Sequence, residues 1–351
     1  MGYDERVYRT RVHEGSARRP TRDDVARLAN TSGATVSRVL SERTGLSISP
    51  ATRERVLEAA KQLGYIPNTA ARALISGKTG IVGFWMSLEY SRYRAQVLDC
   101  MRGLLHGADV ALAVSDVDEQ LNTLHSFDRA LRVPVDGIIA FDNSASVDLF
   151  AREHGRLAPG KPFVSMGAYW SELKSYVGVD LYQGGRSAMT HLLATGRRRI
   201  AYLAPWTSGL IDSGPRFEAF RNALVEIGLP PRTIGFETVS FRHIQEALQE
   251  IVSERTLPDA LLCMNDDTAI TAATVLRDLG VQVGHAVAIV GFDGIEETAH
   301  CPVPITTVRQ PIEEMCSRAW MFMKTQMEDP SAPLQQVVLT PELVIRASSA
   351  Q

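Results

Sequence analysis

Seven short apolar segments, separated by stretches with helical periodicity, constrain the fold of this 351-residue chain more than any other feature. Continuous apolar runs that alternate with helices are typical of buried parallel strands in doubly wound α/β units. The series is long enough for two such units, the second starting near Val179, with Thr306–Arg309 and Gln336–Ile345 completing the sheets. The seven runs are Ile81–Met86, Val110–Val114, Gly137–Phe141, Phe163–Met166, Ile200–Ala204, Ala260–Met264 and Val287–Phe292.

Polar side chains follow four of these runs, at the point where each predicted strand ends. Asp116, Asp142, Asn265 and Asp293 occupy such positions. Ligands of open α/β sheets bind beyond the carboxyl ends of strands, so the four together indicate a pocket for a polar, hydroxyl-rich small molecule. For any one of them taken alone, capping of the next helix is the simpler interpretation.

The region before residue 80 has the pattern of three short helices. Thr21 with Asp24 resembles a capping box, Ser32 is a plausible cap for a second helix, and Ser49 caps a third. The segment Val25–Leu40 contains two short helices joined by a tight polar turn. This arrangement predicts a helix-turn-helix, whose second helix can enter the major groove of DNA.

Charge is unevenly distributed along the chain. Residues 1–79 carry 14 Lys or Arg against 8 Asp or Glu, whereas the whole chain has a net charge of −3. A basic head on an acidic body fits a DNA-binding module joined to a domain that does not touch DNA. The expected divisions are a basic tail at 1–19, a helix-turn-helix domain at 20–66, a hinge helix and linker at 67–79, and a two-lobed core at 80–351.

Several functional classes are disfavoured by what the sequence lacks. It shows no secretory signal and no apolar segment long enough to span a bilayer, so a cytoplasmic protein is expected. Cys100, Cys263, Cys301 and Cys316 do not have metal-ligand spacing, so no metal and no cofactor are predicted. No nucleophile elbow, P-loop or dinucleotide-binding glycine motif occurs in the required context, which argues against an enzyme.

Six motifs resemble the LacI/GalR family of bacterial transcription regulators, over a span from about Pro20 to the C-terminus. They are TVSRVL (Thr35–Leu40), ATRERVLEAAKQLGYIPN (Ala51–Asn68), VGVDLYQGGRSAMTHLLATGRRRIAYL (Val177–Leu203), CMNDDTAI (Cys263–Ile270), IVGFDGI (Ile289–Ile295) and PITTVRQP (Pro304–Pro311). The resemblance implies a three-helix headpiece, a hinge helix, and two lobes like those of periplasmic sugar-binding proteins. It also implies a homodimer, in some members a tetramer, that binds a near-palindromic operator. A small effector between the lobes changes operator affinity.

The second helix of the headpiece carries the residues most suited to contact DNA. Arg38 can pair bidentately with guanine, or instead contact a phosphate or a surface acid. Ser32, Thr35 and Ser37 have short hydroxyls that suit phosphate oxygens or base edges, although Ser32 can equally serve as a cap. The candidate DNA contacts are Thr21, Ser32, Gly33, Ala34, Thr35, Ser37, Arg38, Asn68, Ala71 and Leu74.

Some of these candidates come from the resemblance or depart from it. The resemblance places Asn68 and Ala71 where the hinge helix begins and makes Leu74 an apolar wedge in the minor groove. Gly33 and Ala34 depart from the family, which often has larger base-reading side chains there, and Ala34 can at most touch a thymine methyl.

The candidate effector contacts have three sources. The resemblance matches Arg216, Asn265 and Asp293 to pocket positions of the family. Tyr93 and Trp170 are aromatic side chains that can stack on a sugar ring, and Asp116 and Asp142 follow predicted strands. Where the family often has Asn-Pro-Phe, this chain has Ser91-Arg92-Tyr93, a departure that leaves the class of effector open.

Two functions fit a core of this kind. The first is a sequence-specific transcription regulator, expected to act as a repressor. Its expected effector is a sugar or a sugar derivative. The alternative is a solute-binding protein of a transport system. The helix-turn-helix and the absence of a secretory signal favour the regulator.

Overall fold

The computed structural model describes residues 20–40, 48–65, 77–117, 129–142, 160–170, 172–206 and 212–350. Contacts between Cα atoms divide the chain into two compact units, Met1–Thr79 and Gly80–Gln351. Each unit has its own hydrophobic core. The expected hinge helix, Thr69–Ile75, lies outside the described residues.

Three helices form the described part of the first unit, which is called the headpiece here. They are α1 (Arg22–Leu28), α2 (Gly33–Leu40) and α3 (Pro50–Leu63). Each helix contacts the other two, and Val25, Val36 and Val56 are fully buried between them.

Side-chain caps start all three helices, as the sequence predicted. Thr21 Oγ1 accepts from the backbone N–H of Asp24 at 3.3 Å, and Asp24 Oδ2 accepts from the N–H of Thr21 at 2.9 Å, so the capping box is confirmed. Ser32 and Ser49 each accept the N–H three residues ahead, at 3.1 and 3.3 Å. The helix starts are therefore fixed by neighbours in the sequence.

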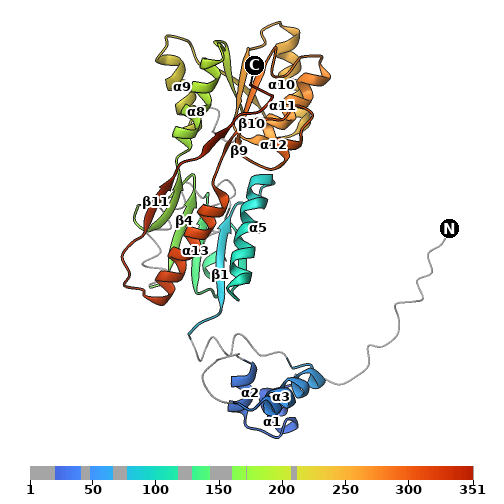
Figure 1. Cartoon of the computed structure of the whole chain (residues 1–351), viewed down its shortest axis with the longest axis vertical. Coiled ribbons are helices and arrows are strands. Elements are labelled where there is room, and N and C mark those ends of the chain that lie inside the picture. The colour runs from blue at the N-terminus through green and yellow to red at the C-terminus, as the bar shows by residue number, and fades with distance from the viewer. Residues whose placement is uncertain are drawn as a thin grey trace, which may run out of the picture. The chain divides into compact units, whose positions relative to one another are not determined.

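Six parallel strands form the sheet of the first lobe of the core, in the order β11-β5-β4-β3-β1-β2. Helices α5 (Arg92–Gly107) and α13 (Ile312–Glu328) pack against each other and against this sheet (Figure 1). The expectation of uniformly buried strands is wrong for β2, which lies at the sheet edge and is largely exposed. The strands are β1 (Ile81–Met86), β2 (Ala111–Asp116), β3 (Gly137–Phe141), β4 (Phe163–Gly167), β5 (Ser175–Val179) and β11 (Gln336–Leu339).

The second lobe has its own six-stranded sheet, in the order β12-β10-β9-β8-β6-β7, with only β12 antiparallel to its neighbour. Alternate strand residues face opposite layers: Tyr202 packs in one cluster with the helix pair α8–α9, and Leu203 in another with α10–α11. Two doubly wound lobes are thus confirmed. The elements are α8 (Leu181–Ala194), β6 (Ile200–Pro205), α9 (Pro215–Val225), β7 (Arg232–Phe236), α10 (Phe241–Ser253), β8 (Ala260–Cys263), α11 (Asp266–Asp278), β9 (Ala288–Asp293), α12 (Glu297–His300), β10 (Thr306–Arg309) and β12 (Glu342–Val344).

The chain passes between the two lobes three times, after β5, after β10 and between β11 and β12 (Figure 1). The segment Gln336–Ile345 is not one strand, because it splits at Thr340-Pro341 into β11 and β12, which belong to different sheets. Proline has no backbone N–H to donate, so it interrupts the ladder at that point.

Two further strands, β5 and β7, were not among the predicted runs.

None of the helices within the described ranges is both long enough and apolar enough to cross a membrane.

Candidate functional site

Helix α2 buries one face in the headpiece and exposes the other. Val36 and Val39 are buried. Of the predicted DNA contacts on this helix and at its cap, Ser32, Ala34, Ser37 and Arg38 are exposed, and Gly33 and Thr35 are partly exposed. An exposed polar face on the second helix of a helix-turn-helix is the surface that can enter a major groove.

The remaining predicted DNA contacts lie outside α2, and Ser32 at its start has a second role. Thr21 is part of the capping box of α1. Ser32 accepts the amide of Thr35, so its capping role is present alongside any contact to DNA. Asn68, Ala71 and Leu74 lie outside the described residues.

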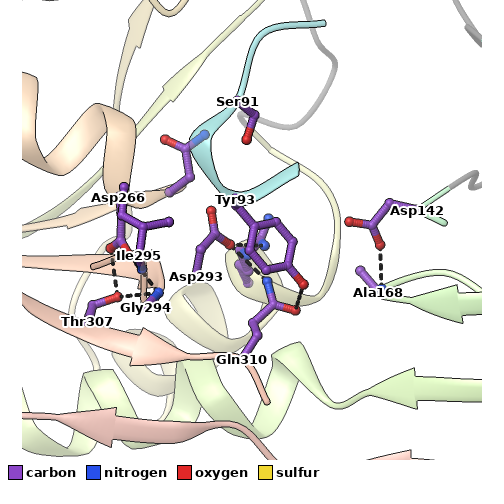
Figure 2. Close-up of polar contacts among 12 residues, drawn as sticks. Ser91, Tyr93, Asp142, Ala168, Asp266, Asp293, Gly294, Ile295, Thr307 and Gln310 are labelled. Atoms are coloured by element: carbon purple, nitrogen blue, oxygen red, sulfur yellow. Dashed lines mark hydrogen bonds and ion pairs between the residues drawn. The ribbon is translucent and has the colours of Figure 1, made fainter. Parts of the chain in front are cut away.

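In the core, a chain of hydrogen bonds connects the two lobes at the carboxyl ends of their strands. Tyr93, in the first turn of α5, donates its hydroxyl to Gln310 Oε1 at 2.9 Å. Gln310 follows β10 and donates Nε2–H to Asp293 Oδ1 at 2.9 Å. Asp293 is the last residue of β9 (Figure 2). The first lobe thus contributes the phenol, and the second contributes the amide and the carboxylate.

Arg216 completes this chain from the first turn of α9. Its Nη2 donates to Asp293 Oδ1 at 3.2 Å, and its guanidinium carbon lies 4.9 Å from the centre of the Phe292 ring. The Nε atom of Arg216 is buried and has no hydrogen-bond partner among the described residues. A buried donor without a partner is costly, so this atom marks a place where a ligand oxygen would be stabilised.

The environment sets the protonation of these groups. Burial raises the pKa of Tyr93 well above its ordinary value, and the charges of Asp142 and Asp293 raise it further, so the phenol keeps its proton. Burial also raises the pKa of Asp293 to about 7, against the opposing effects of Arg216 and Gln310. Burial lowers the pKa of Arg216, but Asp293 and two nearby tyrosines outweigh it, so the guanidinium stays charged.

A second buried aspartate holds the turn that carries Asp293. Asp266 Oδ2 accepts the N–H groups of Gly294 and Ile295 at 2.7 and 3.0 Å, and its Oδ1 accepts the Thr307 hydroxyl at 2.7 Å (Figure 2). Asp293 has a φ of 114°, a conformation that side-chain-bearing residues rarely adopt. The bonds to Asp266 therefore stabilise a strained turn and fix the direction of the Asp293 carboxylate.

The remaining candidates have different surroundings. Asp142 follows β3 and accepts the N–H of Ala168 at 2.6 Å, and its charge acts on Tyr93, Asp293 and Arg216. Trp170 stacks on Tyr176, with 5.5 Å between ring centres.

Asp116 and Asn265 accept backbone hydrogen bonds of the kind that anchor a loop or cap a helix. Asp116, at the exposed edge strand, accepts the N–H of Leu88 at 3.1 Å. Asn265 is the N-cap of α11 and accepts the N–H of Thr268 at 2.9 Å. The structure thus joins Arg216 to Asp293 directly and Tyr93 to Asp293 through Gln310, with Asp142 in electrostatic range, and it gives the other candidates separate partners.

Sequence reasoning missed Gln310, Asp266 and Arg92. Gln310 directly follows the predicted strand Thr306–Arg309, so the strand-end rule applied to that strand would have found it. Arg92, at the start of α5, pairs with Asp267 and lies 3.6 Å from Glu297 Oε1, both in the second lobe. No sequence pattern signals a pair formed across two lobes.

Comparisons with known proteins bear on the family and the fold of the chain. A model of the bacterial regulatory proteins of the lacI family matches residues 21–68, and a model of a periplasmic binding protein-like domain matches residues 189–349. The HTH-type transcriptional regulator CelR of Thermobifida fusca is 30% identical over 342 residues, which cover 94% of this chain and 98% of CelR.

Two solved structures are similar over nearly the whole length. A transcriptional regulator CelR–cellobiose complex has a TM-score of 0.63 at 26% identity, covering 94% of this chain and 100% of the other. A lac repressor dimer bound to operator and the anti-inducer ONPF has a TM-score of 0.77 at 23% identity, covering 94% and 99%. The second likeness shows a shared fold.

Proposed function

The chain belongs to the lacI family of bacterial regulatory proteins, and from this premise we propose that it is a DNA-binding transcriptional regulator, acting as a repressor, with a carbohydrate-like effector. The effector binds between the lobes of the core and changes the affinity for operator DNA. The observation that carries the effector site is the hydrogen-bonded chain Tyr93–Gln310–Asp293–Arg216, which spans both lobes and leaves a buried guanidinium nitrogen without a described partner.

The physical reason for this assignment is the mixture of donors and acceptors at the strand ends. A sugar hydroxyl can donate to a carboxylate oxygen and accept from a guanidinium N–H, and Arg216 with Asp293 offers both. A ligand that contacts both lobes binds the closed arrangement better than the open one, and it thereby shifts the population of the core. CelR, whose structure contains cellobiose, is the relative that supports a sugar.

The DNA partner follows from the headpiece. A homodimer would place two α2 helices on two half-sites of a near-palindromic operator. The lac repressor structure, a dimer on its operator, supports this assembly by its shared fold. On this proposal the protein works in the cytoplasm, where the chromosome lies, and it catalyses no reaction. Thr21, Ser32, Gly33, Ala34, Thr35, Ser37 and Arg38 remain the proposed DNA contacts in the described headpiece.

Selection of bound sequences from a pool of random duplexes tests the regulator directly. The full-length protein should enrich a near-palindromic sequence, and titration of that duplex at fixed salt should show binding at least about a thousandfold tighter than to random DNA. Enrichment of no sequence above background would contradict the proposal. Addition of cellobiose, lactose, ribose or glucose to the complex then tests whether a sugar changes the affinity.

A further inference from the structure

Two cysteines meet where α5 and α13 pack against each other in the first lobe. Cys100 lies on α5 and Cys316 on α13, and the two helices are in contact (Figure 1). Cys316 is fully buried in the hydrophobic cluster that these helices form with the sheet, and Cys100 packs against this cluster and is partly exposed. A side-chain hydrogen bond joins the two thiols. The pair thus combines one thiol that solvent can reach with one that it cannot.

The position of Cys316 against α5 supports this contact independently. Its Sγ lies 3.8 Å from the carbonyl oxygen of Val97, which is three residues before Cys100. A helical side chain points back over the preceding turn, so the side chain of Cys100 covers the same part of α5. The sulfur of Cys316 therefore faces the turn of α5 over which the Cys100 thiol lies.

The spacing of packed helices allows a disulfide at such a point. Helix axes in contact are about 8–10 Å apart, and each Cα atom lies about 2.3 Å from its own axis, which leaves about 3.4–5.4 Å between facing Cα atoms. The Cα atoms of disulfide-linked cysteines are usually about 4.4–6.8 Å apart. The two ranges overlap, so a bond between these sulfurs does not require the helices to separate.

The two thiols differ in reactivity. The hydrogen bond from Cys316 lowers the pKa of Cys100, against the opposing effect of burial, and so favours the Cys100 thiolate. The same hydrogen bond, together with burial, raises the pKa of Cys316, which keeps its proton. The thiolate is the form that reacts with oxidants. Cys100 is therefore suited to react first, and Cys316 to react second.

The other two cysteines of the chain have different surroundings. Cys263 is fully buried in β8, and burial raises its pKa. Cys301 is partly exposed, but burial raises its pKa as well, and its thiol donates to the carbonyl oxygen of Glu297 at 3.2 Å. Cys301 therefore provides a comparison for Cys100 at similar exposure.

We propose that Cys100 and Cys316 form a peroxide-oxidisable pair that closes a reversible disulfide between α5 and α13. The Cys100 thiolate attacks one oxygen of hydrogen peroxide, so that an S–O bond forms, the O–O bond breaks, and the hydroxide that leaves takes up the proton that Cys100 had released. The Cys316 sulfur then attacks the sulfur of this sulfenic acid. An S–S bond forms, the S–O bond breaks, and a second hydroxide leaves as water with the proton of Cys316. Two thiols thus lose two electrons, and one peroxide is reduced to two waters.

The proposed disulfide ties together the two helices whose starts carry a bond between the lobes. Tyr93 lies seven residues before Cys100 on α5, and Gln310 lies six residues before Cys316, just ahead of α13. Tyr93 donates to Gln310, so a covalent link farther along both helices restricts how these two side chains can separate. Disulfides in reducing compartments are usually transient and redox-sensing, and the position of this pair fits such a role.

Peptide mapping of the full-length protein tests the proposal. The reduced protein is treated with hydrogen peroxide, the remaining thiols are alkylated, and trypsin then releases Cys100 in peptide 95–102 and Cys316 in peptide 310–318. We expect these two peptides to be linked after peroxide treatment and to separate after reduction with dithiothreitol. Cys100 should be oxidised at least about tenfold faster than Cys301, because a larger fraction of it is thiolate.

Variants separate the two chemical steps. In Cys316→Ala, oxidation of Cys100 should stop at the sulfenic acid, which dimedone labels. In Cys100→Ser, Cys316 should stay reduced. Cys301→Ser is the matched control and should form the same link as the wild-type protein. The peptide map of the wild-type protein needs no substitution, so it decides the proposal even if a core variant fails to fold.

Three results would overturn the proposal. Alkylation of both Cys100 and Cys316 in the peroxide-treated protein would show that no disulfide forms between them. A link between peptide 95–102 and a second copy of itself would place the reacting partner in another chain. Oxidation of Cys301 as fast as that of Cys100 would show that the contact with Cys316 does not activate Cys100.

Discussion

The headpiece and the core differ in how far along the chain their polar side chains find partners. In the headpiece, Thr21, Ser32 and Ser49 each bond to the residue three positions ahead. In the core, Tyr93 bonds to a residue 217 positions away, and Arg216 to one 77 positions away. A local cap sets where one helix begins, whereas a long-range bond sets how separate elements meet. The structural effect of losing a cap should therefore be confined to one helix. Losing a long-range hydrogen bond in the core should affect both the site and the packing of the lobes that form it.

The largest effect is expected for Asp266→Ala. The substitution leaves the Ile295 N–H and the Thr307 hydroxyl without their acceptor, and the Gly294 N–H keeps only its longer bond to Thr307 Oγ1, at 3.2 Å. Unsatisfied buried donors cost about 1–3 kcal/mol each, so the loss of two acceptors should lower the unfolding free energy of the core by about 2–6 kcal/mol. Urea denaturation measures this loss.

Asp278→Ala is the control for that variant on the same helix. Asp278 is 56% exposed and pairs with the adjacent Arg277, and exposed pairs contribute about 0–1 kcal/mol. A similar loss for both variants would mean that the Asp266 bonds do not hold the turn after β9.

The next-largest effect is expected for Arg216→Ala, which should lower the affinity of the core for the effector. The substitution removes the guanidinium donors that we propose contact the effector, and a hydrogen bond to a charged group contributes about 1.5–3 kcal/mol, so the effector affinity should fall at least about tenfold. Operator binding without effector should remain, because the headpiece is a separate compact unit. Calorimetry and DNA titration measure the two properties.

Arg186→Ala provides a matched arginine variant outside the proposed site. Arg186 forms a bidentate pair with Glu226, at 2.9 and 2.8 Å, on the surface of the second lobe. Its loss should leave effector affinity unchanged. An unaltered affinity in Arg216→Ala would instead assign the Arg216–Asp293 pair to folding alone.

The same contrast explains which parts could be predicted from the sequence. The caps at Thr21, Ser32 and Ser49 were predictable, because donor and acceptor lie within one turn of each other. Most central strands were predictable because burial on both faces gives continuous apolar runs. The edge strand β7 was missed, since its exposed Arg232 and Thr233 break that pattern.

The site was only partly predictable, for a related reason. Strand-end position and the family resemblance indicated Asp293 and Arg216 as candidates. The partners of these residues depend on how β9, β10 and the starts of α5 and α9 are brought together, which no local pattern specifies. Gln310 links Tyr93 to Asp293 only because the two lobes meet at that point.

The stability of the core should depend on pH because the carboxyl group of Asp293 is buried. Asp293 has a pKa of about 7 in the folded protein, against about 3.9 for an unperturbed aspartate. Its contribution to stability is therefore fully present below about pH 4 and is lost as pH rises through 7, because the unfolded chain releases the proton first. Each unit of difference corresponds to about 1.4 kcal/mol.

Comparison with Asp293→Asn isolates this contribution. From pH 5 to pH 8 the wild-type protein should lose unfolding free energy relative to the variant, as measured by urea denaturation at each pH. Parallel curves for the two proteins, or a wild-type advantage that grows with pH, would show that burial does not raise this pKa.

Arg38→Ala tests the headpiece side of the comparison. Loss of one bidentate base contact should weaken cognate operator binding by about 1–3 kcal/mol, with a much smaller loss on random DNA. The effector affinity of the core should not change. Equal losses on both DNAs, measured by titration at one salt concentration, would assign Arg38 to a phosphate contact.

The smallest effect is expected for Thr21→Ala, and it tests the local nature of headpiece bonds most directly. Removing an N-cap hydroxyl costs about 0.5–2 kcal/mol, typically about 1. The N–H of Asp24 then loses its side-chain acceptor, so the amides of the first turn of α1 should exchange faster. Thr21→Ser keeps the hydroxyl and should restore protection. Exchange in α11 and β9 should be identical in all three proteins. Faster exchange there, or an altered effector affinity, would mean that even a three-residue cap reaches the core, and the distinction between local and long-range bonds would fail.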